Sequence, residues 1–529
     1  MIIPWLTSLQ NSAILIKKKY SSKNEGNRKG KVLEHLQQSE FWVSVTETAL
    51  DDCYSNLILF LSKDWMTMSK RQQCLSSNTE GSATDRISSL PDPIIYHILS
   101  FLPAVDVVQT CILSKRWGIL WCSVPTLDFD NSVFNIARKN FNKKKKKKAR
   151  IHFVKFVENV LLMRDGSDIY KFRLKLDADN NNTNRVCAWI SLAIRRNVQV
   201  LQIYIPYWID QPFELPPSLL RCKSLRVLEL WFELGQASLN LPTSLWLSNL
   251  KTLYLKSVMF YDSQSVESLI SSCPALETLV LESCGVSQMK SLTISTLHLK
   301  KLTITDSNYV PGGKLRIITP ALTNLSLTFT IPDICVFEEL HSLSEAVISL
   351  LDKQLSDKVL QFLRGLRDAK SVTLCTHFHD IMISSLADNV FVSLQTPLFN
   401  VKCLKMKVYP RSNRVIESLL KYCPNVEALA LDFYLNTDIP QSIEMGNLQL
   451  DHLTSVNIEC FSGYSNEVEV VKYLLNCSVV LKKMIVCCHF VKNSVSVDYK
   501  ELIKSCPRGS PDSEIVFIEP LYWKSKPCF

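Results

Sequence analysis

A short pattern, L-x-x-L-x-L, recurs along much of this chain and constrains its fold more than any other feature. It occurs as LRVLEL at residue 225, LKTLYL at 250 and LETLVL at 276. Further, less regular copies begin at 169, 198, 299, 322, 369, 401, 426 and 453. The starts lie mostly about 23 to 32 residues apart, and the pattern is blurred over 330–368. This period is typical of a strand followed by a helical or irregular return.

The alternation inside the pattern predicts which side chains each strand buries. In LRVLEL, Leu228 and Leu230 fall on one face of the strand, and Val227, Glu229 and Trp231 fall on the other. One such strand cannot close a core, but stacked parallel strands can. About 11 or 12 strands, roughly 4.8 Å apart, give a concave surface on the order of 50 Å long. The sequence therefore predicts an α/β solenoid, a parallel-sheet horseshoe with helical returns.

Two of the returns have the pattern of helices. SQSVESLISSCP precedes one strand and NRVIESLLKYCP precedes another, and in both an apolar stripe ends at Cys-Pro. Proline cannot continue a helix and favours extended geometry in the residue before it, so it fixes the crossover. The whole array resembles the leucine-rich-repeat solenoids, in an irregular version with long repeats.

A second feature is the stretch SSLPDPIIYHILSFLPAVDVVQTCILSKRWGILW, from Ser88 to Trp121, which has apolar residues at nearly every turn of three short helices. Pro93 suits the first helical position with Asp92 as its N-cap. The other expected boundaries are a stop at Pro103, a start at Asp106 and a cap at Ser114 for a third helix. A unit of around 40 residues is marginal alone. Either it caps the solenoid, or part of its surface binds another protein.

This stretch resembles a known motif. Residues 85–130 are similar to the F-box found with leucine-rich repeats in plants, because LPD at 90, HILSFLP at 97, ILSKRW at 112 and LW at 120 match in order. Gly118 departs from the family, which usually has a larger polar residue there. Glycine in a short helix costs about 1 kcal/mol.

The other end of the chain carries a second resemblance. LTSVNIECFSGYSNEVEVVKYLLNCSVVLKKMIVC from 453, with ELIKSCPRGSPDSEIVF from 501, resembles the FBD domain. The chain is thus identified as a member of the plant F-box/FBD/LRR-repeat family over residues 85–520.

The resemblance implies a non-catalytic subunit of a Skp–cullin–F-box ubiquitin ligase, which recognises the substrate. The F-box would bind a Skp-type adaptor and, through it, a cullin and a RING protein, while the repeats would bind an unknown protein substrate. Carried over residue by residue, the implied adaptor contacts are Leu90, Pro91, Ile94, Ile98, Leu99, Leu102, Val107, Leu113, Trp117, Leu120 and Trp121. Two alternatives stay open: a repeat scaffold whose F-box does not direct degradation, and a decayed family member without a partner.

Candidate substrate contacts come from strand parity. Exposed aromatic residues flanked by charge suit binding hot spots. The concave-face positions chosen on this basis are Arg173, Tyr204, Trp231, Tyr254 and Lys405. The alternative is that most of them are solvated strand positions.

Charge and motif content argue against several other functions. The net charge is +10, but six lysines sit in the single run Lys143–Lys148, whereas a nucleic-acid-binding domain usually spreads its charge over a face. The run reads as a charged loop or as a nuclear-targeting signal. Glycine is scarce, at 13 residues, and no phosphate-binding loop or nucleophile motif occurs, so neither catalysis nor a cofactor is expected.

Metal binding and membrane insertion are not expected either. Cys375, His377 and His379 alternate on one predicted strand face, but a structural zinc site needs four ligands. No run of 18 apolar residues occurs, so no membrane span is expected. The 18 cysteines have no paired spacing and indicate small core residues in a reducing compartment, the nucleus or the cytoplasm or both.

The expected organisation has five parts. Residues 1–82 are expected to form an N-terminal extension without a regular pattern, a candidate for disorder. Met66 and Met68 are candidates for the initiating methionine of the protein. The parts that follow are the F-box at 83–130, a linker with the lysine tract at 131–165, the repeats at 166–440, and the FBD domain at 441–520, continuing the solenoid.

Overall fold

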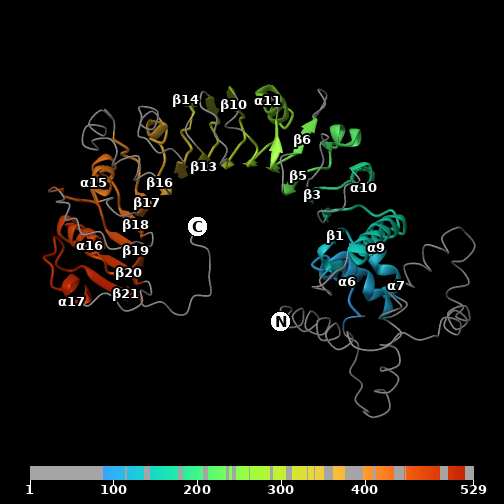
Figure 1. Cartoon of the computed structure of the whole chain (residues 1–529), viewed down its shortest axis with the longest axis horizontal. Coiled ribbons are helices and arrows are strands. Elements are labelled where there is room, and N and C mark those ends of the chain that lie inside the picture. The colour runs from blue at the N-terminus through green and yellow to red at the C-terminus, as the bar shows by residue number, and fades with distance from the viewer. Residues whose placement is uncertain are drawn as a thin grey trace, which may run out of the picture. The chain divides into compact units, whose positions relative to one another are not determined.

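The computed structural model (Figure 1) describes most of the chain from residue 87 to residue 518. Gaps fall at 88, 114–115, 136–142, 177–182, 207–212, 234–236, 241–245, 261, 286–289, 306–312, 330–331, 339, 351–361, 376–396, 409–412, 434–445, 447 and 489–498. The N-terminal extension, with Met66 and Met68, lies outside the described residues, as do His377 and His379.

The chain divides into two compact units. The front unit extends to Asn180 and includes Arg195–Val198, and the repeat unit holds Asn181–Ile194 and everything from Gln199 onward. In the front unit, short helices are followed by one parallel strand pair. Its elements are α5 (Asp92–Leu99), α6 (Ala104–Gln109), the 3-10 turn η1 (Thr110–Ile112), α7 (Trp117–Leu120), the 3-10 turn η2 (Trp121–Ser123), β1 (Thr126–Asp130), α8 (Ser132–Asn135), α9 (Lys143–Leu162) and β2 (Lys171–Lys175).

The helix starts differ from those predicted. Helix α5 begins at Asp92, one residue after Pro91, and Asp92 is not its N-cap. Helix α6 begins directly after Pro103 and not at Asp106. Both prolines have φ near −60° and extended ψ, with no side-chain cap. The proline ring fixes φ at about −65°, which suits the entry into a helix, although proline supplies no side-chain acceptor for the N–H groups of the first turn.

The end of the first helix and the start of the third also differ. Helix α5 stops at Leu99, short of the expected boundary. Helix α7 begins at Trp117 with Arg116 as its N-cap, while Ser114 lies outside the described residues.

The stretch predicted as a linker contains a 20-residue helix, α9, and the lysine run forms its first turns. The apolar residues that follow the run recur at helical spacing, and Phe153, Phe156 and Val157 are buried. The Phe156 ring meets that of Phe129 edge to face, at 6.1 Å between centroids. Just after the helix, Arg164 Nη1 donates a hydrogen bond to the Val124 carbonyl oxygen at 2.7 Å. The segment is therefore a packed layer of the front unit.

The repeat unit is a run of parallel strands that pair in chain order. They are β3 (Val200–Pro206), β5 (Val227–Glu233), β7 (Thr252–Lys256), β9 (Thr278–Glu282), β11 (Lys301–Thr305), β13 (Asn324–Phe329), β15 (Glu345–Leu350), β16 (Ser371–Cys375), β17 (Cys403–Val408), β18 (Ala428–Phe433), β19 (Ser455–Phe461), β20 (Lys483–Cys488) and β21 (Glu514–Ile518). Figure 1 shows them along the inner side of a curve.

The returns lie on the outer side of that curve (Figure 1). The helical returns are α10 (Thr183–Arg195), α11 (Ser263–Ser271), α15 (Asn413–Tyr422), α16 (Ser465–Cys477) and α17 (Tyr499–Lys504). Short strands make two further three-stranded rows, β4 (Phe213–Glu214) with β6 (Ala237–Asn240) and β8 (Val258–Met259), and β10 (Ser291–Ser295) with β12 (Lys314–Ile318) and β14 (Ile334–Glu338). The helices predicted before the two Cys-Pro pairs, α11 and α15, are confirmed.

The predicted leucine core is confirmed. Leu228 pairs in register with Leu253, and Leu230 with Leu255, and all four are at most 2% exposed. Cys273 is also buried as a free thiol. However, the described residues hold 15 strands of this parallel series, more than the 11 or 12 expected. Four of these strands lie outside the repeat pattern. Strand β15 was missed because the sequence EAVISL lacks the leucine spacing, β1 was missed as well, and β20 and β21 lie in the segments that resemble the FBD domain.

None of the helices among the described residues has the length and apolar composition needed to cross a bilayer.

A buried carboxylate holds the start of α16. Glu467 is 1% exposed, and its Oε2 accepts hydrogen bonds from the backbone N–H groups of Ser462 and Gly463 at 2.8 Å and of Tyr464 at 3.3 Å. Gly463 has φ +83°, and a Cβ there would lie 2.7 Å from the Tyr499 ring, so this turn requires glycine.

We expect Glu467→Ala to lower the free energy of unfolding by about 2 to 4 kcal/mol, because the three backbone N–H groups lose their acceptor.

The same residue predicts a pH dependence. Burial raises the pKa of Glu467 to about 7, although the three backbone donors oppose this effect. Between pH 4.5 and 7 the folded chain therefore keeps a proton that the unfolded chain releases, so this contribution to stability is lost as pH rises. We expect the stability of the natural chain, relative to Glu467→Gln, to fall by about 2 kcal/mol from pH 5 to pH 8. Urea unfolding of both chains at both pH values measures it, and an unchanged difference would contradict the assignment.

Candidate functional site

The front helices close a small core of their own. Ile95 is fully buried and Leu99 is 2% exposed. Of the predicted adaptor contacts, the buried ones are Leu99, Val107, Trp117, Leu120 and Trp121. Those with exposed or half-exposed side chains are Leu90, Pro91, Ile94, Ile98, Leu102 and Leu113. The structure thus separates the predicted contacts into a group that stabilises the fold and a group open to a partner.

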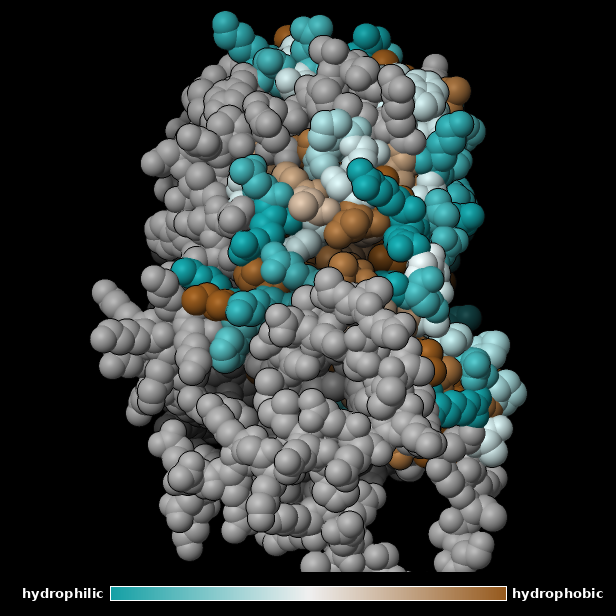
Figure 2. Space-filling view, turned by 90° about the vertical axis from the view of Figure 1, so that its right-hand side faces the viewer, coloured by the Kyte–Doolittle hydropathy of each residue, from teal (hydrophilic) through white to brown (hydrophobic). Residues whose placement is uncertain are grey.

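Apolar surface remains once this core is closed. Ile94 is 47% exposed, Phe101 66%, Leu113 63% and Ile119 60%. Ile94, Ile98 and Phe101 recur at i, i+4 and i+7, on one side of α5 and the turn after it. Figure 2 shows apolar side chains reaching the surface beside hydrophilic ones on the face it presents. We call Leu90, Pro91, Ile94, Ile98, Phe101, Leu102, Leu113 and Ile119 the apolar front surface.

The resemblance missed two members of the apolar front surface, Phe101 and Ile119. The available signal was that the short helices carry more apolar residues than one core can bury.

One arginine fixes the turn that carries Leu90 and Pro91. Arg116 Nη2 donates to the Leu90 carbonyl oxygen at 2.7 Å and forms an ion pair with the Asp92 carboxylate. The Pro91 carbonyl oxygen accepts from the N–H groups of the first turn of α5, at 3.0 and 3.2 Å. Backbone groups make these contacts on the Leu90–Pro91 side, so truncating the two side chains leaves the turn in place.

Gly118 in α7 has room for a side chain. An added Cβ would lie 3.9 Å from the Cys111 carbonyl oxygen, which is ordinary contact. We expect Gly118→Ala to stabilise α7 by about 0.5 to 1 kcal/mol, because alanine restricts the unfolded chain more than glycine does. Amide hydrogen exchange at Leu120 and Trp121 should slow by roughly two- to fivefold, and equal or faster exchange would contradict this expectation.

On the inner face of the repeat unit, three of the predicted substrate contacts come together. Tyr204 on β3 is in register with Trp231 on β5, and their ring centroids lie 4.7 Å apart, edge to face. The Trp231 and Tyr254 rings lie 5.1 Å apart. We call these three residues the aromatic cluster.

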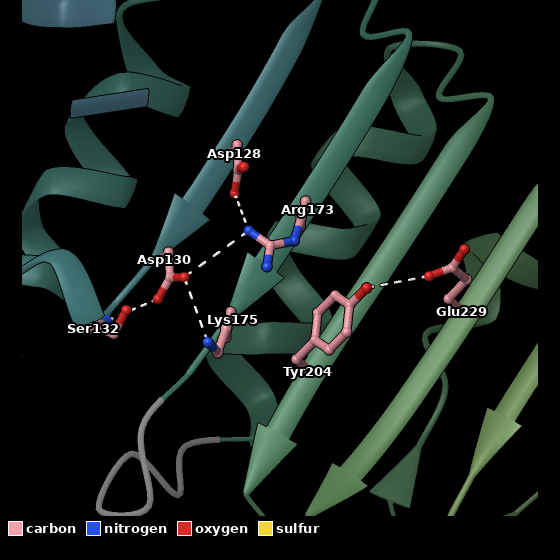
Figure 3. Close-up of polar contacts among 7 residues, drawn as sticks. All are labelled: Asp128, Asp130, Ser132, Arg173, Lys175, Tyr204 and Glu229. Carbon is pink, nitrogen blue, oxygen red and sulfur yellow. Dashed lines mark hydrogen bonds and ion pairs between the residues drawn. The ribbon is translucent and has the colours of Figure 1, made fainter. Parts of the chain in front are cut away.

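Charged groups surround the aromatic cluster. The Tyr204 hydroxyl donates to Glu229 Oε2 at 3.2 Å (Figure 3), and the Tyr254 hydroxyl donates to the Glu282 carboxylate. Lys256 Nζ lies 2.9 Å from Glu282 Oε1 and 5.1 Å from the centre of the Trp231 ring. Burial, then the hydrogen bond to Glu282, raises the pKa of Tyr254. Burial acts to raise the pKa of Glu282, but the bonds from Tyr254 and Lys256 outweigh it, so that pKa is lowered.

Arg173 does not share this arrangement. It belongs to β2 of the front unit, where its Nη1 lies 2.7 Å from Asp128 Oδ1 and 4.0 Å from Asp130 Oδ2. Asp130 also pairs with Lys175 at 3.6 Å and accepts from the Ser132 N–H at 2.8 Å (Figure 3). The Arg173 guanidinium is therefore already engaged inside the front unit.

Lys405 is also apart from the aromatic cluster. It lies on β17, in register with Thr373 of β16 and Ala430 of β18. The strands between β9 and β17 carry mainly small hydroxyl residues in the same row, such as Thr303 and Ser326. Sequence parity gave the correct face for Lys405 but no distance along the sheet.

Three models of known protein families match parts of this chain. The F-box domain model matches residues 87–128, a model described as the LRR repeats of the FBD-associated F-box protein At5g56370 matches 186–335, and the FBD model matches 450–486.

Similar curated proteins come from Arabidopsis thaliana. The F-box/LRR-repeat protein At4g14103 is 31% identical over 65% of this chain and 91% of its own length. The F-box/FBD/LRR-repeat protein At4g26340 is 32% identical over 57% of this chain and 68% of its own. The putative F-box/FBD/LRR-repeat protein At4g13965 is 29% identical over 75% and 89%.

Proposed function

The chain belongs to the F-box/FBD/LRR-repeat family, and on that premise we propose that it is the substrate-recognition subunit of a Skp–cullin–F-box ubiquitin ligase. In this proposal the apolar front surface binds a Skp-type adaptor, which links the chain to a cullin and a RING protein. The repeat unit binds a protein substrate. The chain itself makes and breaks no bonds.

The observation that supports adaptor binding most strongly is the apolar surface left over on the front helices. Four large apolar side chains there are between 47% and 66% exposed, although the unit already has a buried core. Burying such a side chain is worth about 1.5 to 3 kcal/mol, so a partner that covers several of them gains a substantial binding free energy. The F-box match over 87–128 supports a Skp-type adaptor as that partner.

The physical contribution of such a subunit is effective concentration. Holding a substrate next to the ubiquitin-conjugating enzyme converts an encounter in solution into an intramolecular one. Two separate binding surfaces on one chain are sufficient for this role.

The test has two stages. First, the full chain, expressed in plant cells, should co-purify a Skp-type adaptor and a cullin. Second, at least one protein bound by the repeat unit should accumulate when the chain is deleted and return when it is restored. Binding of the adaptor without the cullin, or of the cullin without any protein that accumulates, would instead favour the repeat scaffold that does not direct degradation.

A further inference from the structure

We propose that the aromatic cluster is the anchor for an arginine side chain of the protein that the repeat unit binds, with Glu229 as the carboxylate that receives the guanidinium. This inference deepens the proposed function, since it names the chemistry of the bound partner. It depends on the charges around the cluster, on the cation already seated there and on the neutral row of residues beside it.

The charges around the cluster do not balance. Two carboxylates, Glu229 and Glu282, face one ammonium group, Lys256, and the ammonium pairs with Glu282 at 2.9 Å. In the part of the chain that the structure describes, Glu229 accepts a hydrogen bond from the Tyr204 hydroxyl, which is neutral. Tyr254 stands directly opposite Glu229 in the strand register. One negative charge is thus left at Glu229, at the edge of three aromatic rings.

Lys256 shows what kind of group this surface accepts. Its ammonium lies 5.1 Å from the centre of the Trp231 ring, a cation–π distance. A guanidinium fits the remaining position better than a second ammonium, because it is planar, stacks on aromatic rings and donates two parallel hydrogen bonds to one carboxylate. An arginine from a partner would repeat the lysine arrangement two strands earlier, at Glu229 of β5 in place of Glu282 of β9.

The cluster is also incompletely satisfied by its own chain. The Trp231 Nε1–H is buried and has no hydrogen-bond acceptor within the part of the chain that the structure describes. Buried donors without a partner are rare in folded proteins, and those that occur call for an explanation. The Trp231 N–H is therefore a polar group of the cluster that contacts within this part of the chain leave unsatisfied.

The neighbouring part of the inner face offers no competing charge at this row. Val280 of β9, Thr303 of β11, Ser326 of β13 and Val347 of β15 follow Tyr254 in strand register, and all are neutral. A positively charged side chain that meets the inner face of these strands is therefore drawn to Glu229.

The test compares arginine with its neutral isostere. Biotinylated peptides of 12 residues, with a Gly-Ser frame and three central arginines, are immobilised on a biosensor beside otherwise identical peptides in which citrulline replaces arginine. The full chain should bind the arginine peptide at least about tenfold more tightly than the citrulline peptide. Glu229→Gln should abolish this preference, because the amide keeps the shape of the side chain but removes its charge.

Glu459→Gln on β19 is the matched control, since it removes the same carboxylate charge from the inner face but lies far along the sheet from Glu229. It should leave the arginine preference unchanged. Equal binding of both peptides, or a preference that survives Glu229→Gln, would overturn the inference. Adaptor binding is measured on the same preparations. If the arginine preference holds while the adaptor fails to bind, the proposed ligase role fails and the anchor stands. The reverse result rejects the anchor alone.

Discussion

A chain in which Leu90 and Pro91 are both replaced by alanine is expected to lose its binding to a Skp-type adaptor. Pro91 is exposed, Leu90 is half-exposed, and both precede α5, so neither closes the core of the front helices. Losing the burial of these two side chains should cost about 3 kcal/mol of binding free energy, or roughly a hundredfold in affinity. Because the contacts of the turn are made by backbone groups and Arg116, the circular dichroism spectrum should not change.

The control truncates two exposed apolar side chains in the repeat unit. Leu297 is 72% exposed and Phe399 57%, and replacing both by alanine should leave adaptor affinity as it is. Adaptor binding by the Leu90/Pro91 double variant at the affinity of the natural chain would reject the assignment of these residues.

Trp117→Ala is expected to unfold the front helices, whereas the Leu90/Pro91 double variant should leave them folded. Trp117 is 4% exposed, and replacing a buried tryptophan by alanine costs about 3 to 5 kcal/mol. Helices of this size have little stability to lose. Amide hydrogen exchange between Asp92 and Trp121 should therefore become as fast as in an unfolded chain, while the strands of the repeat unit keep their protection.

Ile119→Ala in the same short helix provides the contrast. Ile119 is 60% exposed, so its truncation should keep amide protection and weaken adaptor binding alone. If Trp117→Ala retained full protection, the division of the front helices into core and surface would be wrong.

The repeat architecture could be predicted because its signal is local. Alternation of leucine with polar residues sets the buried face of each strand without knowledge of its neighbours, and Leu253 and Leu255 are buried as expected. Two of the strands outside the repeat pattern show the limit of that signal. Strand β15 uses Ala346 and Ile348 at the core positions, and β1 follows directly on the front helices, where no repeat precedes it.

The two sites are built by contacts between segments far apart in the sequence, so no local sequence pattern predicts them. The bond from Arg116 to Leu90 joins residues 26 positions apart and fixes the front turn. Parity placed Tyr254 on the inner face, but its bond to Glu282 follows from the pairing of β7 with β9. The lysine tract alone predicts a loop. The residues that pack its helix against the front unit come after the tract, from Phe153 onward.

Hydrogen–deuterium exchange of the full chain, with and without a Skp-type adaptor, tests most directly whether the apolar front surface is a binding surface. The proposed role predicts new protection from Leu90 to Ile94 and around Leu113 and Ile119, with no change in the strands β3, β5 and β7. Unchanged exchange in these front segments, or protection confined to the repeat unit, would contradict it.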